Sequence, residues 1–138
     1  YRDTMLKNGV EIRRDYEVLC SDFKIELAKE AVKKVLDLPD PPTAIFATNF
    51  YMTLGMISVF NERGLVLGKD ISAIGYDSLF VSDIVYPKLT LVEQPLEEAG
   101  RIIAEVIVNR ILHKKDEADS KTITIPTVLI QGNSVKNI

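Results

Sequence analysis

The sequence predicts an α/β fold, built as a parallel sheet with helices on both faces. Segments typical of strands alternate with helical patterns through most of the 138 residues. The segments between successive strands are too long for hairpins, which favours right-handed crossovers between parallel strands. Residues 43–48 are almost entirely apolar, as expected for a strand that is buried on both faces of a parallel sheet.

Each helix and strand is predicted from the spacing of its own apolar residues. The sequence shows no internal repeat and no flexible linker. Helices are predicted where apolar residues recur every three or four positions, and strands where short apolar runs are bounded by turn residues. In chain order we expect helix 1–8, strand 16–20, helix 24–36, strand 43–48, helix 50–63, strand 71–76, a helical turn 79–85, strand 89–92, helix 95–112, a polar turn 116–121 and strands 122–125 and 127–131.

Turn and capping residues mark the ends of these helices. Gly9 and Gly64 end the helices before them, since glycine readily adopts the left-handed C-cap conformation. Ser21 and Asp22 are residue types that cap the start of a helix well, here helix 24–36. Pro95 suits the first turn of the long helix, where its missing N–H costs nothing.

Composition argues against several classes of function. The net charge is −3, so this piece lacks the clustered basic surface that nucleic acid requires. No apolar run approaches the roughly 20 residues of a membrane span, and the first residues show no secretory signal. One Cys (Cys20) and one His leave no plausible zinc site. The dispersed glycines and the absence of a nucleophile motif predict no enzyme and no cofactor.

Polar and aromatic residues follow three predicted strands, at the sheet edge where α/β proteins bind ligands. Asn49 and Asp77 come directly after their strands, and Phe23 follows the first strand closely. An amide and a carboxylate satisfy hydroxyl groups in fixed directions, and a ring packs on the apolar face of a sugar or base. We therefore expect a polyhydroxylated ligand at this edge.

These residues also have purely structural interpretations. Asn49 suits the N-cap of helix 50–63, and Asp77 suits a cap of the turn that follows it. Phe23 suits a hydrophobic staple that holds the entry of its helix to the core. Gln94, before Pro95, suits a cap or a hinge hydrogen bond.

Helix 50–63 is apolar on nearly all sides. It must therefore be buried on two sides, one against the sheet and the other against another element or another subunit. The two apolar stripes consist of Leu54, Ile57 and Phe60 and of Met52, Met56 and Val59.

Short motifs spread over the whole chain form one linked pattern. They are Pro42–Asn49, Met52, Leu54–Gly55, Glu62–Leu65, Asp70–Asp77, Pro87–Pro95, Gly100–Arg101, Ile125–Ile130 and Gly132–Ser134. In order and spacing they resemble the sensor domain of the LacI/GalR family of transcription regulators and its periplasmic sugar-binding relatives.

The resemblance implies a two-lobed sensor of the periplasmic-binding-protein-like type I fold, with its effector between the lobes. Residues 1–91 and about 129–138 would form most of the C-terminal lobe, and about 92–128 would belong to the N-terminal lobe. The first half of the sensor and the DNA-binding headpiece are expected to lie outside this chain.

The resemblance also assigns roles by position. Asn49 and Asp77 match effector-binding positions, Phe23 matches an aromatic that stacks on the ligand, and Gln94 sits at the crossover near the cleft. One residue departs from the pattern. The family usually has Asp after the Asn of this motif, where this chain has Phe50.

Three further positions resemble those of the family's dimer interface. They are Leu54, Ile84 and Val85. The implied protein is a cytoplasmic homodimeric repressor that binds operator DNA through its headpiece and responds to a small molecule, a sugar in the first place. The alternative is a sugar-binding protein of an ABC transporter. Residues 89–95 and 125–127 favour the regulator.

Overall fold

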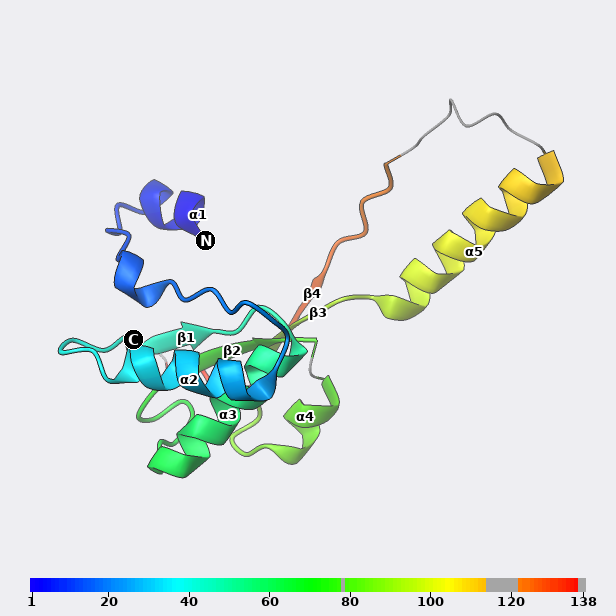
Figure 1. Ribbon diagram of the computed structural model, residues 1–138. Coiled ribbons are helices and arrows are strands. Elements are labelled where there is room, and N and C mark those ends of the chain that lie inside the picture. The colour runs from blue at the N-terminus through cyan, green and yellow to red at the C-terminus, as the bar shows by residue number, and fades with distance from the viewer. Residues whose placement is uncertain (78, 114–121, 137–138) are drawn as a thin grey trace.

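Four strands form one sheet, in the order β1 (Ala44–Phe46), β2 (Ser72–Tyr76), β3 (Thr90–Glu93) and β4 (Val128–Ile130). The computed structural model describes residues 1–77, 79–113 and 122–136. β1, β2 and β3 run parallel, which confirms the predicted α/β class. β4 runs antiparallel to β3, so the expectation of a wholly parallel sheet is wrong at this strand. The chain leaves the sheet after β3 and returns beside it in the opposite direction (Figure 1).

Three helices gather on one side of the sheet (Figure 1). They are α2 (Ile25–Leu36), α3 (Phe50–Arg63) and α4 (Leu79–Ile84). α3 packs on β2, α4 packs on β3, and α2 packs on α3. α1 (Arg2–Lys7) and the 3₁₀ turn η1 (Arg14–Tyr16) lie on the other side and contribute no buried residue.

α3 is buried on two sides, as its sequence predicts, and the second side is covered within this chain by α2. The two helices approach closely at Gly55, where a Cβ atom would lie 2.3 Å from the Cβ of Ala28. Met56, Val59 and Phe60 of α3 are fully buried in the core. The C-cap of α3 is Gly64 in the left-handed conformation, as expected.

Two predicted strands do not form. Residues 17–20 pair with no strand in the described parts of the chain, and Leu19 is 97% exposed. Residues 122–125 are likewise unpaired. The predicted caps Ser21 and Asp22 are also wrong, because the N-cap of α2 is Lys24, which makes no side-chain cap bond. The predicted polar turn 116–121 lies outside the described residues.

The motif Gly132–Ser134 fastens the last segment to the sheet. The buried Ser134 hydroxyl accepts from the N–H of Thr90 at 2.8 Å and donates to the carbonyl of Ala73 at 2.6 Å, which ties β3 to β2. A Cβ atom on Gly132 would lie 2.3 Å from the carbonyl oxygen of Lys88. Only glycine fits this approach, so the motif has a structural role.

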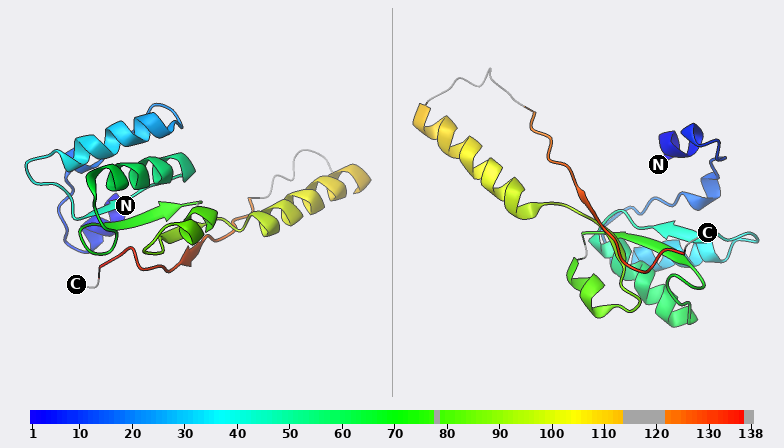
Figure 2. Two further views of the ribbon diagram at one scale, coloured as in Figure 1. Left: turned by 90° about the horizontal axis from the view of Figure 1, so that it is seen from below. Right: turned by 180° about the vertical axis from the view of Figure 1, so that it is seen from behind.

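α5 (Leu96–His113) projects away from the sheet (Figures 1 and 2). Its apolar side chains are therefore exposed to solvent, as are those of the returning segment. The exposed residues include Leu96, Ile103, Ile107, Val108, Ile111, Leu112 and Ile123. Among the described helices, none has the length and apolar run that a membrane crossing requires.

An ion-pair cluster joins α2 to α3 and predicts a pH-dependent stability. The Glu62 carboxylate of α3 contacts Lys29 and Lys33 of α2, and the Lys33 Nζ lies at 2.7 Å. Hydrogen bonds from Lys29 and then Lys33 lower the pKa of Glu62 from 4.5 to about 2. A depressed pKa stabilises the folded state above the unfolded pKa, and that stabilisation is lost as pH falls from 4.5 towards 2.

We expect Glu62→Gln to lower the free energy of unfolding at pH 7 and to have progressively less effect as pH falls from 4.5 to about 2. Urea denaturation across this range measures the difference. Glu30→Gln on the exposed face of α2 is the matched control, and we expect it to change little. A Glu62→Gln effect that is equal at pH 2 and pH 7 would contradict the assignment.

Candidate ligand site at the carboxyl ends of the strands

Asp77 stands at the carboxyl end of β2 in a backbone conformation that orients its side chain. Its φ is +51°, a left-handed conformation that is uncommon outside glycine. Its N–H donates to the carbonyl of Val92 at 3.0 Å, which ties it to β3. The half-buried carboxylate therefore lies over the ends of two parallel strands, where α/β sheets bind ligands.

Gln94 holds the Asp77 carboxylate. Its backbone N–H donates to Oδ1 at 3.2 Å, and its side-chain amide donates to Oδ2. Gln94 itself is exposed, just past the end of β3. Gln94 thus makes hydrogen bonds to a predicted site residue.

Asn49 is the N-cap of α3, one of the two roles that its sequence position suits. Its Oδ1 accepts from the N–H of Met52 at 3.0 Å, and its backbone is extended. Its amide nitrogen makes no hydrogen bond to the described parts of the chain. Asn49 therefore offers a donor at the end of β1 while its oxygen caps the helix.

Thr53 links these two positions, and the sequence analysis did not identify it. Its buried hydroxyl donates to the carbonyl of Asn49 at 2.9 Å and accepts from the N–H of Tyr76 at 3.1 Å. It thus fixes the start of α3 against the end of β2. A Thr one turn after a capping Asn, facing a Gly on the next strand, is the signal that would have found it.

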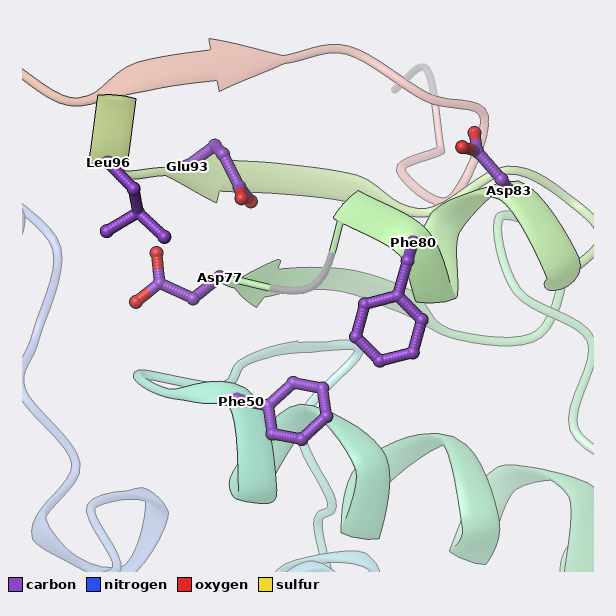
Figure 3. Close-up of a pocket in the computed structure, with 6 residues that line it drawn as sticks. All are labelled: Phe50, Asp77, Phe80, Asp83, Glu93 and Leu96. Atoms are coloured by element: carbon purple, nitrogen blue, oxygen red, sulfur yellow. The ribbon is translucent and has the colours of Figure 1, made fainter. Parts of the chain in front are cut away.

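Phe50 and Phe80 face each other in a pocket at the same end of the sheet (Figure 3). Their ring centroids are 5.5 Å apart. The pocket has a volume of about 540 Å³ and is also lined by Asp77, Asp83, Glu93 and Leu96. The Asp77 carboxylate lies on the far side of the pocket from the two rings (Figure 3). Phe50, where an Asp was expected from the resemblance, therefore packs on an aromatic ring.

Phe23 is not brought to this pocket. It precedes α2 and is 69% exposed, so it does not staple the helix to the core. Its N–H donates to its neighbour, the Asp22 carboxylate, at 2.7 Å. The structure thus joins Asp77 to Gln94 directly, sets Asn49 nearby through Thr53, and leaves Phe23 at the surface.

The polar groups at this edge suit recognition of hydroxyl groups. Asp77 supplies acceptors, and the amides of Asn49 and Gln94 supply donors. Within the described ranges, no group of three or more His, Cys, Asp or Glu side chains is placed to hold a metal ion.

Comparison with known proteins places this geometry in a family. A model of the periplasmic binding protein-like domain matches residues 1–135. The HTH-type transcriptional repressor PurR of Photobacterium profundum is 30% identical over all 138 residues, which cover 40% of that protein. The chain thus spans less than half the length of this relative.

Two solved structures share the fold along nearly the whole chain. A transcriptional regulator LacI from Bacillus cereus subsp. cytotoxis superposes with a TM-score of 0.85 and 28% identity, over 96% of this chain and 46% of that one. The regulator CelR in complex with cellobiose superposes with a TM-score of 0.83 and 30% identity, over 97% of this chain and 40% of that one.

The contact of Thr53 with Gly75 yields a stability prediction. A Cβ atom on Gly75 would lie 2.7 Å from the Thr53 Cγ2, so Gly75→Ala should destabilise the protein by about 1–3 kcal/mol through overpacking. Thr53→Ser removes that methyl group and keeps the hydroxyl, so Gly75→Ala should cost less in this background. A double-mutant cycle by chemical denaturation measures the coupling. Equal costs in both backgrounds would show that the cost comes from Leu91 and Leu89, whose Cδ2 atoms would lie 2.8 and 3.0 Å from the same Cβ, and not from Thr53.

Proposed function

Since the chain belongs to the periplasmic-binding-protein-like family, in the branch of LacI-type repressors, we propose that it is the C-terminal part of the effector sensor of a DNA-binding transcription regulator. The observation that carries the proposal is the match to a repressor over all 138 residues. The polar edge around Asp77 supports it. The named relatives are regulators, which favours this function over sugar transport.

The sensor has two lobes, and this chain contributes to both. Residues 1–91 and about 129–138 form most of one lobe, and about 92–128 belong to the other. The exposed apolar side chains of α5 support this division, because an apolar helix surface is stable when another element covers it. The relatives are more than twice as long as this chain, so they have room for the remainder of the second lobe.

The effector binds between the lobes, against Asp77, Asn49, Gln94 and Phe23. Asp77 accepts hydroxyl protons, the two amides donate, and the exposed ring of Phe23 stacks on an apolar face of the ligand. A sugar fits this set of groups. The cellobiose bound by the regulator CelR supports the same class.

Effector binding shifts the balance between two arrangements of the lobes. Asp77 is bonded to Gln94, which leads directly into α5. A ligand hydroxyl that takes over the Asp77 carboxylate releases Gln94, so ligand occupancy is coupled to the position of α5. The ligand changes the free-energy difference between the two arrangements by the difference in its binding free energy for them, and by no more.

The protein is a homodimer that pairs through Leu54, Ile84 and Val85. Ile84 on α4 is 80% exposed, while Leu54 and Val85 are partly buried against the core. Phe80 and Tyr86, which are close to Ile84 in the sequence, are also exposed, so the region around α4 presents several apolar side chains. Exposed apolar side chains that cluster on one element are typical of an interface.

The effector site is tested by thermal shift of the intact protein with a panel of sugars, sugar phosphates and nucleobases. A ligand at 100 times its Kd should add about 2.7 kcal/mol to the free energy of unfolding. We expect one compound to raise the Tm of the wild type and of Asp37→Asn, a carboxylate at the C-cap of α2, at the opposite end of the sheet. Asp77→Ala should lose this shift. A shift that Asp77→Ala retains would contradict the site.

The dimer surface is tested by Ile84→Asp, with Leu6→Asp as the matched control at an exposed apolar position on α1. Loss of a central interface contact costs about 2 kcal/mol or more, so the dissociation constant of the dimer should rise at least about 30-fold over that of the wild type. Sedimentation equilibrium of the intact protein measures this. Equal dissociation constants for both variants would rule out the α4 surface as the interface.

A further inference from the structure

Two aromatic rings form one side of the pocket at the carboxyl ends of the strands. The ring centroids of Phe50 and Phe80 are 5.5 Å apart, and the ring planes are tilted by 41° to each other. Figure 3 shows both rings on one side of the pocket and the Asp77 carboxylate on the other. The pocket is therefore aromatic on one side and polar on the other.

Both rings are carried by helix starts at this edge of the sheet. Phe50 is the first residue of α3 and follows Asn49, whose side chain caps that helix. Phe80 lies in the first turn of α4, which packs on β3. The elements that place the polar groups of the effector site thus place the two rings beside them.

Core packing does not account for this pair of rings. Phe50 is partly buried against the core, but Phe80 is 62% exposed. An exposed ring gains little of the free energy that burial gives to a core side chain. Tyr51 contacts Phe50 edge-on, with centroids 5.4 Å apart, but it does not line the pocket. The aromatic side of the pocket is consequently open to a ligand.

The charges around the pocket disfavour an anionic group in it. Asp77, Asp83 and Glu93 line the pocket, and none of its described lining residues is Lys, Arg or His. Asp83 is paired on its other side with Lys88, at 3.3 Å, whereas the Asp77 carboxylate is held by the uncharged Gln94. A phosphate or carboxylate group on the ligand would therefore be repelled.

We propose that the effector carries a planar ring without negative charge, which binds against Phe50 and Phe80 while its hydroxyl groups bind Asp77. This inference rests on the proposed effector site and names the class of its ligand. Aryl glycosides and nucleosides share this chemistry, because each joins a flat ring to a group with several hydroxyls. The pocket volume of about 540 Å³ lies within the usual range of small-molecule sites.

A ring fits this side of the pocket better than further hydroxyl groups do. The side chains of Phe50, Phe80 and Leu96 offer no hydrogen-bonding group, so a hydroxyl placed against them loses its bonds to water without replacement. A planar ring loses no such bonds and gains contacts with two other rings. Coverage by a second subunit would account for Phe80 alone, and not for the position of Phe50 next to Asn49.

Isothermal titration calorimetry of the intact protein tests the inference with matched pairs of compounds. Phenyl β-glycosides of glucose, galactose and xylose are compared with the methyl β-glycosides of the same sugars, and adenosine and uridine with methyl β-ribofuranoside. We expect one ring-bearing compound to bind at least about fivefold more tightly than its ring-free partner, since ring stacking alone provides that much. The pair that responds distinguishes an aryl glycoside from a nucleoside. A carboxylate added to the ring should weaken binding.

Leucine variants separate a ligand contact from a packing contact. Phe50→Leu keeps an apolar side chain against the core but removes the flat face, so the preference for the ring-bearing compound should fall about two- to tenfold. Phe80→Leu should lower it as well. Tyr51→Leu is the matched control, because it removes a ring of the same cluster that does not line the pocket, and it should keep the preference.

Two results would overturn the inference. In the first, no ring-bearing compound binds, or each binds no more tightly than its ring-free partner. A ring-free sugar whose binding depends on Asp77 would then still support the proposed function. In the second, Phe50→Leu and Phe80→Leu leave the preference unchanged, which means that protein side chains cover the two rings. A change confined to the dissociation constant of the dimer would then assign Phe80 to the interface.

Discussion

The close approach of α3 to β2 at Gly75 decides where the helices lie on the sheet. With no side chain at Gly75, the Thr53 methyl group packs directly above the strand, and the Thr53 hydroxyl then reaches the backbone of Asn49 and Tyr76. That one residue sets the start of α3 against the end of β2. The amide of Asn49 and the carboxylate of Asp77 consequently share one sheet edge, while α2 is held in the outer layer by packing on α3.

Most of the fold was predictable because its signals are local. The strands around Ile45, Ile74 and Leu91, the helices between them and the cap at Gly64 all follow from periodicity and turn residues within a short window. The α/β class followed from their alternation. The reversed direction of β4 was not predictable in this way, because it depends on where the chain returns after α5.

The remaining differences come from non-local contacts. Residues 16–20 have the composition of a strand, but a strand exists only where a neighbouring strand pairs with it, and composition contains no information about that neighbour. For the site, Asp77 and Gln94 were placed at the right edge, whereas their direct bond depends on the positive φ of Asp77. Thr53 was missed because its role depends on Gly75, which is remote in sequence.

The paired strands β3 and β4 have a mechanical consequence. β3 is paired with β4 as far as Glu93 and Val128, one residue pair beyond its pairing with β2. Further out, residues 94–95 and 122–127 connect the sheet to the rest of the chain without strand pairing. These two short connections are therefore the hinge between the sheet and α5. The sheet keeps its shape while the angle at the hinge changes.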